Sequence, residues 1–304
     1  MMKKATYLLA LLIALLPIGC RHHVSDTEGL TDGEKLEALD FQIEKHPKDA
    51  AALYERSQVL FNLGRTKEAV ADIERAVELQ PDNLTYRLQE ADLHFASGNV
   101  EKSYRDLTAA EELAPQSIDV QLKMGEVTFY SRDYDRSMRC LNQVIEQDPD
   151  NQTALFMKGF IFKEKGDTAS AVQLLSRVCD LYPDYEPAFE ELGILYSSRN
   201  NPLAVEYLGT ALQLQPSNTN AIYAMAMYHQ ANANMDIAEE LYRRMLDINP
   251  QSADALHNLG YIELTHYHDY QRAAEYFDRA LQADPDHEAA AENRKLAYEL
   301  LNIQ

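Results

Sequence analysis

The chain has 304 residues, of which 46% are hydrophobic and 25% are charged, so it contains enough apolar material for a packed core. Its 28 Lys and Arg residues are outnumbered by 49 Asp and Glu residues, which gives a formal net charge of −21. Such a surface repels the phosphates of nucleic acids and the headgroups of anionic lipids, and it favours encounters with basic partners.

The N-terminal residues have the pattern of a bacterial secretory signal. Lys3 and Lys4 precede an almost unbroken apolar run over residues 5–18. The run is shorter than the roughly 20 apolar residues of a membrane-spanning helix, which makes a permanent transmembrane anchor the weaker interpretation. We therefore expect export across the inner membrane of a bacterium.

The apolar run ends at Gly19 and Cys20. This ending resembles a bacterial lipobox, in which a small residue precedes a cysteine that becomes lipidated and N-terminal, although Pro17 stands where that family usually has Leu. We expect a signal peptide over 1–19, a lipid on Cys20, a flexible tether over 20–31 and a location on the outer membrane. The alternative is an ordinary cleaved signal followed by a coincidental cysteine. Acyl chains on the cysteine would supply the membrane affinity that an acidic domain lacks.

Prolines recur through the rest of the chain at intervals of 33 to 35 residues: Pro47, Pro81, Pro115, Pro149, Pro183, Pro216, Pro250 and Pro285. Between them, apolar residues recur three or four apart in two successive segments, which predicts two helices in each interval. Small residues recur where the paired helices must approach closely: Ala69, Ser103, Ser137, Ala171, Ala204, Ala238 and Ala273. Bulky residues follow four positions later: Ile73, Leu107, Leu141, Leu175, Leu208, Tyr242 and Phe277.

This pattern resembles the tetratricopeptide repeat, in which helix-turn-helix units of 34 residues stack on their neighbours. A small residue also stands at the eighth position of each unit: Ser57, Ala91, Gly125, Gly159, Gly193, Ala226 and Gly260. The resemblance implies an all-α, right-handed solenoid of about seven units over 48–285. A half-unit helix over 32–47 would precede it, and a capping helix over 286–304 would follow it.

Two units depart in length at the turn between their paired helices. The fifth is one residue short near Asn200 to Pro202, and the seventh is one residue long near His266 to Tyr270. Length changes are best tolerated at such turns. The tryptophan that the family carries in its first helix is absent from the chain.

Motifs for catalysis are not found. No Gly-rich nucleotide loop and no GxSxG elbow occur, and His287-Glu288 begins like a zinc protease motif that fails at Ala291. Cys140 and Cys179 can pair in an oxidising compartment or remain separate buried thiols. We expect a protein that is not an enzyme and that needs no cofactor.

The best metal candidate is the lengthened turn of the seventh unit. It carries His266, His268 and Asp269, and His257 belongs to the same unit. Imidazoles two residues apart on a loop can chelate, but nothing positions a fourth ligand or an outer shell. We expect a polar turn without a metal, whose Tyr267 and Tyr270 pack inward.

The resemblance places a ligand site on the concave side, where positions two, five, nine, twelve and thirteen of each first helix lie. The expected peptide-binding groove consists of Tyr54, Gln58, Phe61, Asp92, Phe95, Glu126, Phe129, Tyr130, Phe156, Phe160, Tyr223, Met227 and Tyr261. Further members are Lys163, Glu190, Gln230, His257 and Leu264. The family subtype that clamps C-terminal carboxylates is excluded, because Asp92 and Glu126 occupy places where it has basic or amide residues.

Four aromatic side chains of this groove are expected to be partly exposed, because helix pairing assigns them no packing role: Phe129, Phe156, Phe160 and Tyr223. The alternative is that curvature of the array buries them against neighbouring units. Exposed aromatics would anchor a protein or peptide ligand with apolar and basic residues. We expect a membrane-anchored scaffold or adaptor that organises a cell-envelope complex. The alternative is a periplasmic chaperone-like carrier of envelope proteins.

Overall fold

The computed structural model describes residues 30–302, so the signal peptide, Cys20 and nearly all of the tether lie outside the described residues. Within this range there are 16 α-helices, one π-helical turn and no strand. They are α2 (Asp32–Lys45), α3 (Ala50–Asn62), α4 (Thr66–Leu79), α5 (Leu84–Ala96), α6 (Val100–Leu113), α7 (Ile118–Tyr130), α8 (Tyr134–Gln147), α9 (Gln152–Glu164), α10 (Thr168–Leu181), α11 (Glu186–Ser197), α12 (Leu203–Leu214), α13 (Thr219–Ala231), α14 (Met235–Ile248), α15 (Ala253–Ile262), η1 (Glu263–Tyr267), α16 (Tyr270–Ala283) and α17 (Glu288–Leu301).

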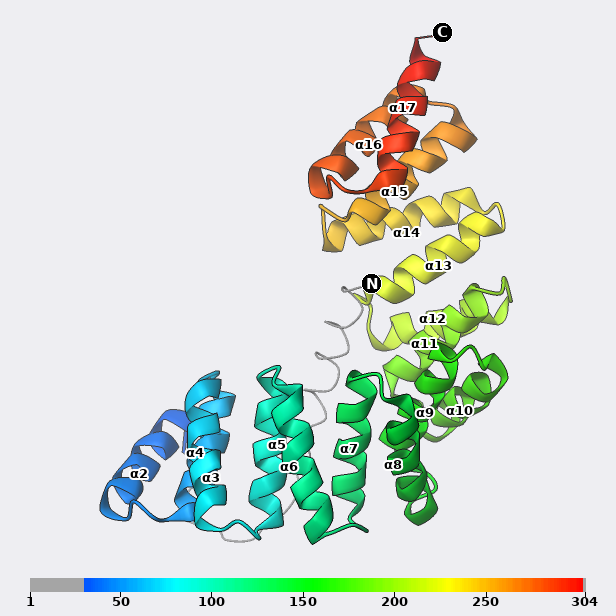
Figure 1. The fold of residues 1–304 in the computed structure, drawn as a ribbon. Helices are drawn as coiled ribbons and strands as arrows, with labels where there is room; N and C mark the ends of the chain where they lie inside the picture. The colour runs from blue at the N-terminus through cyan, green and yellow to red at the C-terminus, as the bar shows by residue number, and fades with distance from the viewer. Residues whose placement is uncertain (1–29, 303–304) are drawn as a thin grey trace. The chain divides into compact units, whose positions relative to one another are not determined.

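The helices divide into two compact halves, an N-terminal half up to residue 157 and a C-terminal half from residue 158 onward, with the division inside α9. Within each half, the two helices of a repeat pack against each other, and successive pairs lie side by side (Figure 1). The predicted fold class is confirmed: an all-α solenoid of helix-turn-helix repeats, preceded and followed by a single helix.

The boundary between repeats uses the same local chemistry almost every time. The residue two places after the proline is the N-cap of the next first helix, and its side chain accepts a hydrogen bond from a backbone N–H of the first turn. These caps are Asp49, Asn83, Ser117, Asn151, Asn218 and Ser252. The exception is Tyr185, whose side chain makes no cap hydrogen bond.

The turn inside each repeat passes through one residue in the left-handed region of backbone space: Gly64, Gly98, Arg132, Gly166, Asn200, Ala233 and His268. The extra residue of the seventh repeat is absorbed by η1, a π-helical turn just ahead of His268. In the fifth repeat, which is one residue short, both helices are shorter than their neighbours. First helix α11 has 12 residues where α9 and α13 have 13, and second helix α12 has 12 where α10 and α14 have 14.

The core of each repeat is the seam between its two helices. The predicted small residues on the second helices are fully buried, and the bulky residues four places later are at most 1% exposed. Four glycines at the eighth position lie directly against those bulky side chains: Gly125, Gly159, Gly193 and Gly260. A Cβ at any of them would lie 2.6 to 3.0 Å from a carbon of the facing Leu or Phe side chain, so the seam has no room for a larger residue.

Terminal helices cover the open ends of the array. Arg56 ties α2 to the first repeat, since its Nη1 lies 2.7 Å from Asp40 Oδ1 and its Nε lies 2.6 Å from Asp72 Oδ2. At the other end, α17 buries Ala290 and Ala297 against the seventh repeat. Both helices hide apolar surface that a stack of repeats would otherwise expose.

Candidate protein-binding face

Side chains of successive first helices meet directly within each half. In the N-terminal half, the rings of Phe95 on α5 and Tyr130 on α7 have centroids 5.4 Å apart and meet edge to face. In the C-terminal half, Lys163 on α9 forms an ion pair with Glu191 on α11. The first helices of each half therefore form a continuous surface, which we call the first-helix face.

In the N-terminal half, the first-helix face consists of three rows of partly exposed side chains. The rows correspond to positions five, nine, and twelve or thirteen of each repeat, which lie about one helical turn apart on the same side of a helix. The outer rows are apolar or aromatic: Tyr54, Leu88 and Leu122 on one side, and Phe61, Phe95 and Tyr130 on the other. The middle row is polar: Gln58, Asp92 and Glu126.

A small charged cluster lies at the centre of this half. Lys123 Nζ is 2.7 Å from both carboxylate oxygens of Asp92. Burial lowers the pKa of Lys123, but Asp92 and Glu126 outweigh burial and raise that pKa above its ordinary value, so the amine is charged. Glu126 accepts no hydrogen bond from the described part of the chain. Desolvation by the surrounding protein raises the pKa of Glu126 to about 7, with Lys123 opposing the shift and Asp92 adding to it.

In the C-terminal half, the middle row of the face is apolar. It contains Ile194, Met227 and Tyr261, and the last two are each 38% exposed. The ion pair of Lys163 and Glu191 lies on the same face, and the Lys163 ammonium is 4.5 Å from the centroid of the Phe160 ring. A row of exposed apolar side chains at successive repeats is a surface that a partner segment can cover.

Comparison with known proteins identifies the repeat. Models of the tetratricopeptide repeat match residues 50–83, 122–186 and 223–293, together more than half of the chain. The chain belongs to the tetratricopeptide repeat family.

Solved structures agree with this assignment. A tetratricopeptide repeat protein from Parabacteroides merdae matches with a TM-score of 0.61 and 17% identity over 82% of this chain and 98% of its own. The C-terminal part of a repeat protein from Cytophaga hutchinsonii matches with a TM-score of 0.60 and 15% identity over 79% and 98%. PilF from Pseudomonas aeruginosa matches with a TM-score of 0.60 and 22% identity over 69% and 95%. At these identities the likeness establishes the shared fold.

Of the thirteen predicted groove side chains, twelve are at least partly exposed, including Phe156, Phe160 and Tyr223. The predicted exposure of Phe129 is wrong. Its side chain is 6% exposed, because its ring turns toward the second helix of the same repeat and packs 5.7 Å from the ring of Tyr134. Tyr130, one residue later, lies on the face instead.

Three further expectations about this surface are wrong. Leu264 is 5% exposed and belongs to the core of the last repeat. Tyr223 is not free of packing, since its ring lies 6.3 Å from that of Tyr242 and contacts the buried core. Glu190 is buried rather than on the face, because the side-chain amide of Asn218 donates to both Glu190 Oε2 at 2.8 Å and Glu186 Oε1 at 2.6 Å. That amide therefore supplies hydrogen bonds to two carboxylates that have little contact with water.

The predicted groove did not include Lys123 and Glu191, because it was drawn from other positions of the repeat. Both occupy position six of their repeats, beside rather than within the expected set, and both form ion pairs with residues of the preceding first helix. The sequence contains a signal for both residues. Lys123 lies about one repeat after Asp92, and Glu191 lies about one repeat after Lys163, so each stands at that distance from a residue of opposite charge.

The described residues offer little for catalysis or metal binding. No group of three or more His, Cys, Asp or Glu side chains among them is arranged to hold a metal. Tyr267, predicted to pack inward, is exposed, and its hydroxyl donates to Glu239 Oε2 at 2.9 Å. Cys140 and Cys179 are free and buried, and burial raises the pKa of Cys179 to about 12. A thiol with that pKa is a poor nucleophile at neutral pH.

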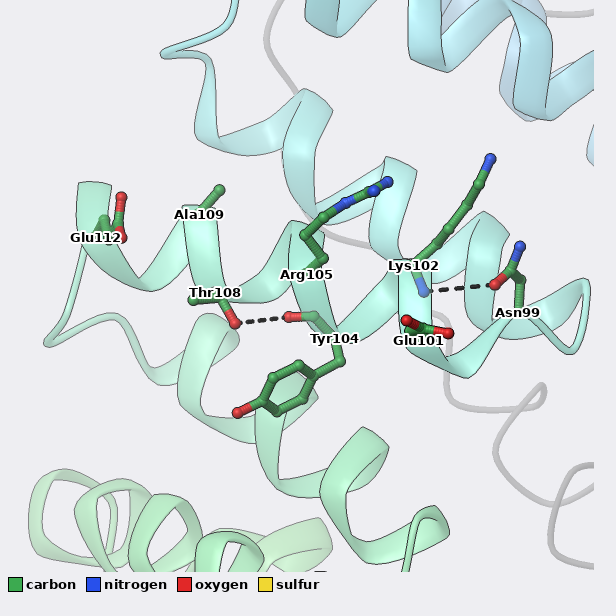
Figure 2. Close-up of a pocket in the computed structure, with 8 residues that line it drawn as sticks. All are labelled: Asn99, Glu101, Lys102, Tyr104, Arg105, Thr108, Ala109 and Glu112. Atoms are coloured by element: carbon green, nitrogen blue, oxygen red, sulfur yellow. Dashed lines mark hydrogen bonds between the residues drawn. The ribbon is translucent and has the colours of Figure 1, made fainter.

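An open depression lies on the second helix of the second repeat (Figure 2). Its lining residues all belong to α6 or directly precede it: Asn99, Glu101, Lys102, Tyr104, Arg105, Thr108, Ala109 and Glu112. A single helix cannot enclose a ligand, so this depression is not a candidate site. None of the described helices is both long enough and apolar enough to cross a bilayer.

Proposed function

We propose that this protein is a membrane-anchored scaffold that holds a segment of a partner protein on its first-helix face and thereby organises a complex in the bacterial cell envelope. Tetratricopeptide repeats are protein-interaction modules, and the described residues of this chain support a partner site on the first-helix face. The observation that carries it is the exposure of Met227 and Tyr261 at the same position of successive repeats.

Leaving apolar side chains in water costs free energy that a bound partner can recover. Met227 and Tyr261 each expose more than a third of their surface in a chain with a net charge of −21, where charged residues are plentiful. Covering such a side chain returns about 1–2 kcal/mol, and aromatic anchors near the centre of an interface often contribute more. The helices fix the backbone beneath these side chains, so little backbone entropy is lost on binding.

The envelope location rests on residues 1–20. The apolar run followed by Gly19-Cys20 supports export and lipidation. The net charge of −21 supports the need for a lipid, since an acidic protein is repelled by anionic membranes. A tether between Cys20 and α2 would leave the repeats free to meet partners away from the bilayer.

Affinity isolation from detergent-solubilised envelopes tests the proposal. The double variant Met227→Ala with Tyr261→Ala should lose partners that the unaltered chain recovers, while circular dichroism shows the same helix content. The matched control is Tyr104→Ala with Ile237→Ala, which removes similarly exposed side chains from second helices. One partner at a fixed ratio fits a scaffold, whereas many unrelated clients fit a chaperone-like carrier. Undiminished recovery by the first double variant contradicts binding on this face.

A further inference from the structure

The two carboxylates nearest Lys123 in the N-terminal half differ in their hydrogen bonding. Asp92 receives both of its contacts from Lys123. Glu126, one turn after Lys123 on α7, keeps accessible surface and has no hydrogen-bond donor among the described residues. Asp119, also on α7, adds a further negative charge near the pair. With Glu126 ionised, the cluster has three carboxylates and one ammonium, so it attracts another cation.

An aromatic residue stands one helical turn beyond each acidic residue of the middle row in these two helices. Tyr130 follows Glu126 by one turn on α7, and Phe95 follows Asp92 by one turn on α5. The two rings meet edge to face with an interplanar angle of 85°. An arginine or lysine head placed beside Glu126 therefore has an aromatic surface within reach, and such cation–π contacts add to the ionic attraction.

The C-terminal half contains the same combination with its cation already in place. Lys163 forms an ion pair with Glu191 and lies 4.5 Å from the centroid of the Phe160 ring, on the same first-helix face. The scaffold thus holds an ammonium between a carboxylate and an aromatic ring by means of its own side chain. In the N-terminal half, the cation near Glu126 is Lys123, whose printed hydrogen bonds go to Asp92, so among the described residues its single charge is shared between two carboxylates.

We infer that the first-helix face of the N-terminal half selects a basic residue, Arg or Lys, within an otherwise apolar segment of the partner, and that Glu126 is the carboxylate that receives it. This inference rests on the proposed function, since it names the chemistry of the segment that the face holds. The apolar rows on either side of the acidic row accept the neighbouring apolar residues of that segment.

Proton release should accompany this binding. Desolvation raises the pKa of Glu126 to about 7, so near neutral pH the free carboxyl carries a proton part of the time. A partner cation favours the ionised form and lowers that pKa, so binding releases a proton and tightens as pH rises from 6 to 8. The other charged groups that act on Glu126 are Lys123, which is already cationic, and Asp92, which Lys123 holds.

Selection of a displayed library of random dodecapeptides against the full chain tests the inference. Enriched peptides should contain Arg or Lys flanked by apolar residues. A synthetic copy of the most enriched peptide should bind the Glu126→Gln variant about tenfold more weakly than the unaltered chain. The control Glu101→Gln removes an equal charge from the exposed side of α6 and should leave binding unchanged. Binding by the unaltered chain should also release protons, measured by calorimetry in buffers of different ionisation enthalpy.

The outcomes separate this inference from the function on which it rests. Enriched peptides that lack a basic residue, but that lose binding in the Phe95→Ala variant, overturn the inference and leave the first-helix face as the binding site. Peptides that bind Phe95→Ala and the Met227→Ala, Tyr261→Ala variant as well as they bind the unaltered chain contradict both proposals. The same holds for a selection that enriches nothing.

Discussion

Gly193 on α11 lies directly against Leu208 on α12: a Cβ on the glycine would come within 2.6 Å of Leu208 Cγ and within 2.9 Å of the Leu208 backbone nitrogen. The second contact is with backbone, which cannot move aside as a side-chain tip can. Among the four repeats that have glycine at the eighth position, the fifth therefore has the closest approach between its two helices. It is also a repeat whose second helix is shortened. Its stability depends on that close approach.

The substitution Gly193→Ala should destabilise the protein by roughly 1–3 kcal/mol through overpacking. The matched substitution Gly209→Ala lies in α12 of the same repeat, where nothing lies within 4 Å of the added Cβ. It should stabilise the protein by about 0.5–1 kcal/mol, because alanine is the better helix former. Urea unfolding followed by circular dichroism measures both changes, and equal effects of the two alanines would contradict the assigned seam.

The left-handed turns predict a stabilising substitution. Ala233 has a φ of 59°, which costs a side-chain-bearing residue energy that glycine avoids, and three other repeats have glycine at this place. Ala233→Gly should therefore raise stability by up to about 1 kcal/mol, whereas Gly64→Ala, at a φ of 74°, should lower it by a similar amount. Thermal unfolding of both variants distinguishes this account from one in which turn residues are interchangeable.

Stability should fall as pH rises from 5 to 8 because of Glu186. Burial raises the pKa of Glu186 to about 7 from an unfolded value near 4.5, with Asn218 opposing the shift and Glu190 adding to it. A carboxyl with a raised folded-state pKa contributes stability that is complete below pH 4.5 and is lost as pH rises through 7. Glu186→Gln mimics the protonated form, so it should match the unaltered chain at pH 5 and exceed it at pH 8 by about 1–3 kcal/mol. Equal denaturation midpoints for the two proteins at both pH values would contradict this.

The periodic features of the fold were predictable from the sequence because each follows from local chemistry. Proline spacing determined the repeat boundaries, and the small and bulky positions of the second helices identified the seam, whose members are nearly all fully buried. The extra residue near His266 was also visible. Its form as a π-helical turn was not, because several backbone paths accommodate one added residue.

The binding face was predictable only in part. Phe129 and Phe95 share position twelve, yet Phe129 turns into the pair seam and Phe95 does not, because neighbouring side chains such as Tyr134 and Tyr130 decide the orientation near a helix end. Pairs such as Asp92 with Lys123 join residues of different repeats, so no spacing within one helix reveals them.

The anchor makes an independent prediction. Cys20→Ala should move the exported protein from the membrane pellet to the soluble fraction, because the acidic repeats would then carry no acyl chain. Membranes should first be stripped of peripheral proteins with high salt, so that a partner does not retain the variant. If the variant still sediments with such membranes, the lipid is not the anchor.

Site-specific photo-cross-linking in the native envelope tests the central claim most directly. A photoreactive phenylalanine analogue would replace Met227 or Tyr261 on the first-helix face, each of which is 38% exposed. As controls it would replace Tyr104 or Ile237 on second helices, which are 42% and 44% exposed. We expect the first two positions to cross-link to a partner protein and the last two not to do so. Cross-links from Tyr104 and Ile237 with none from Met227 and Tyr261 would contradict binding on the first-helix face.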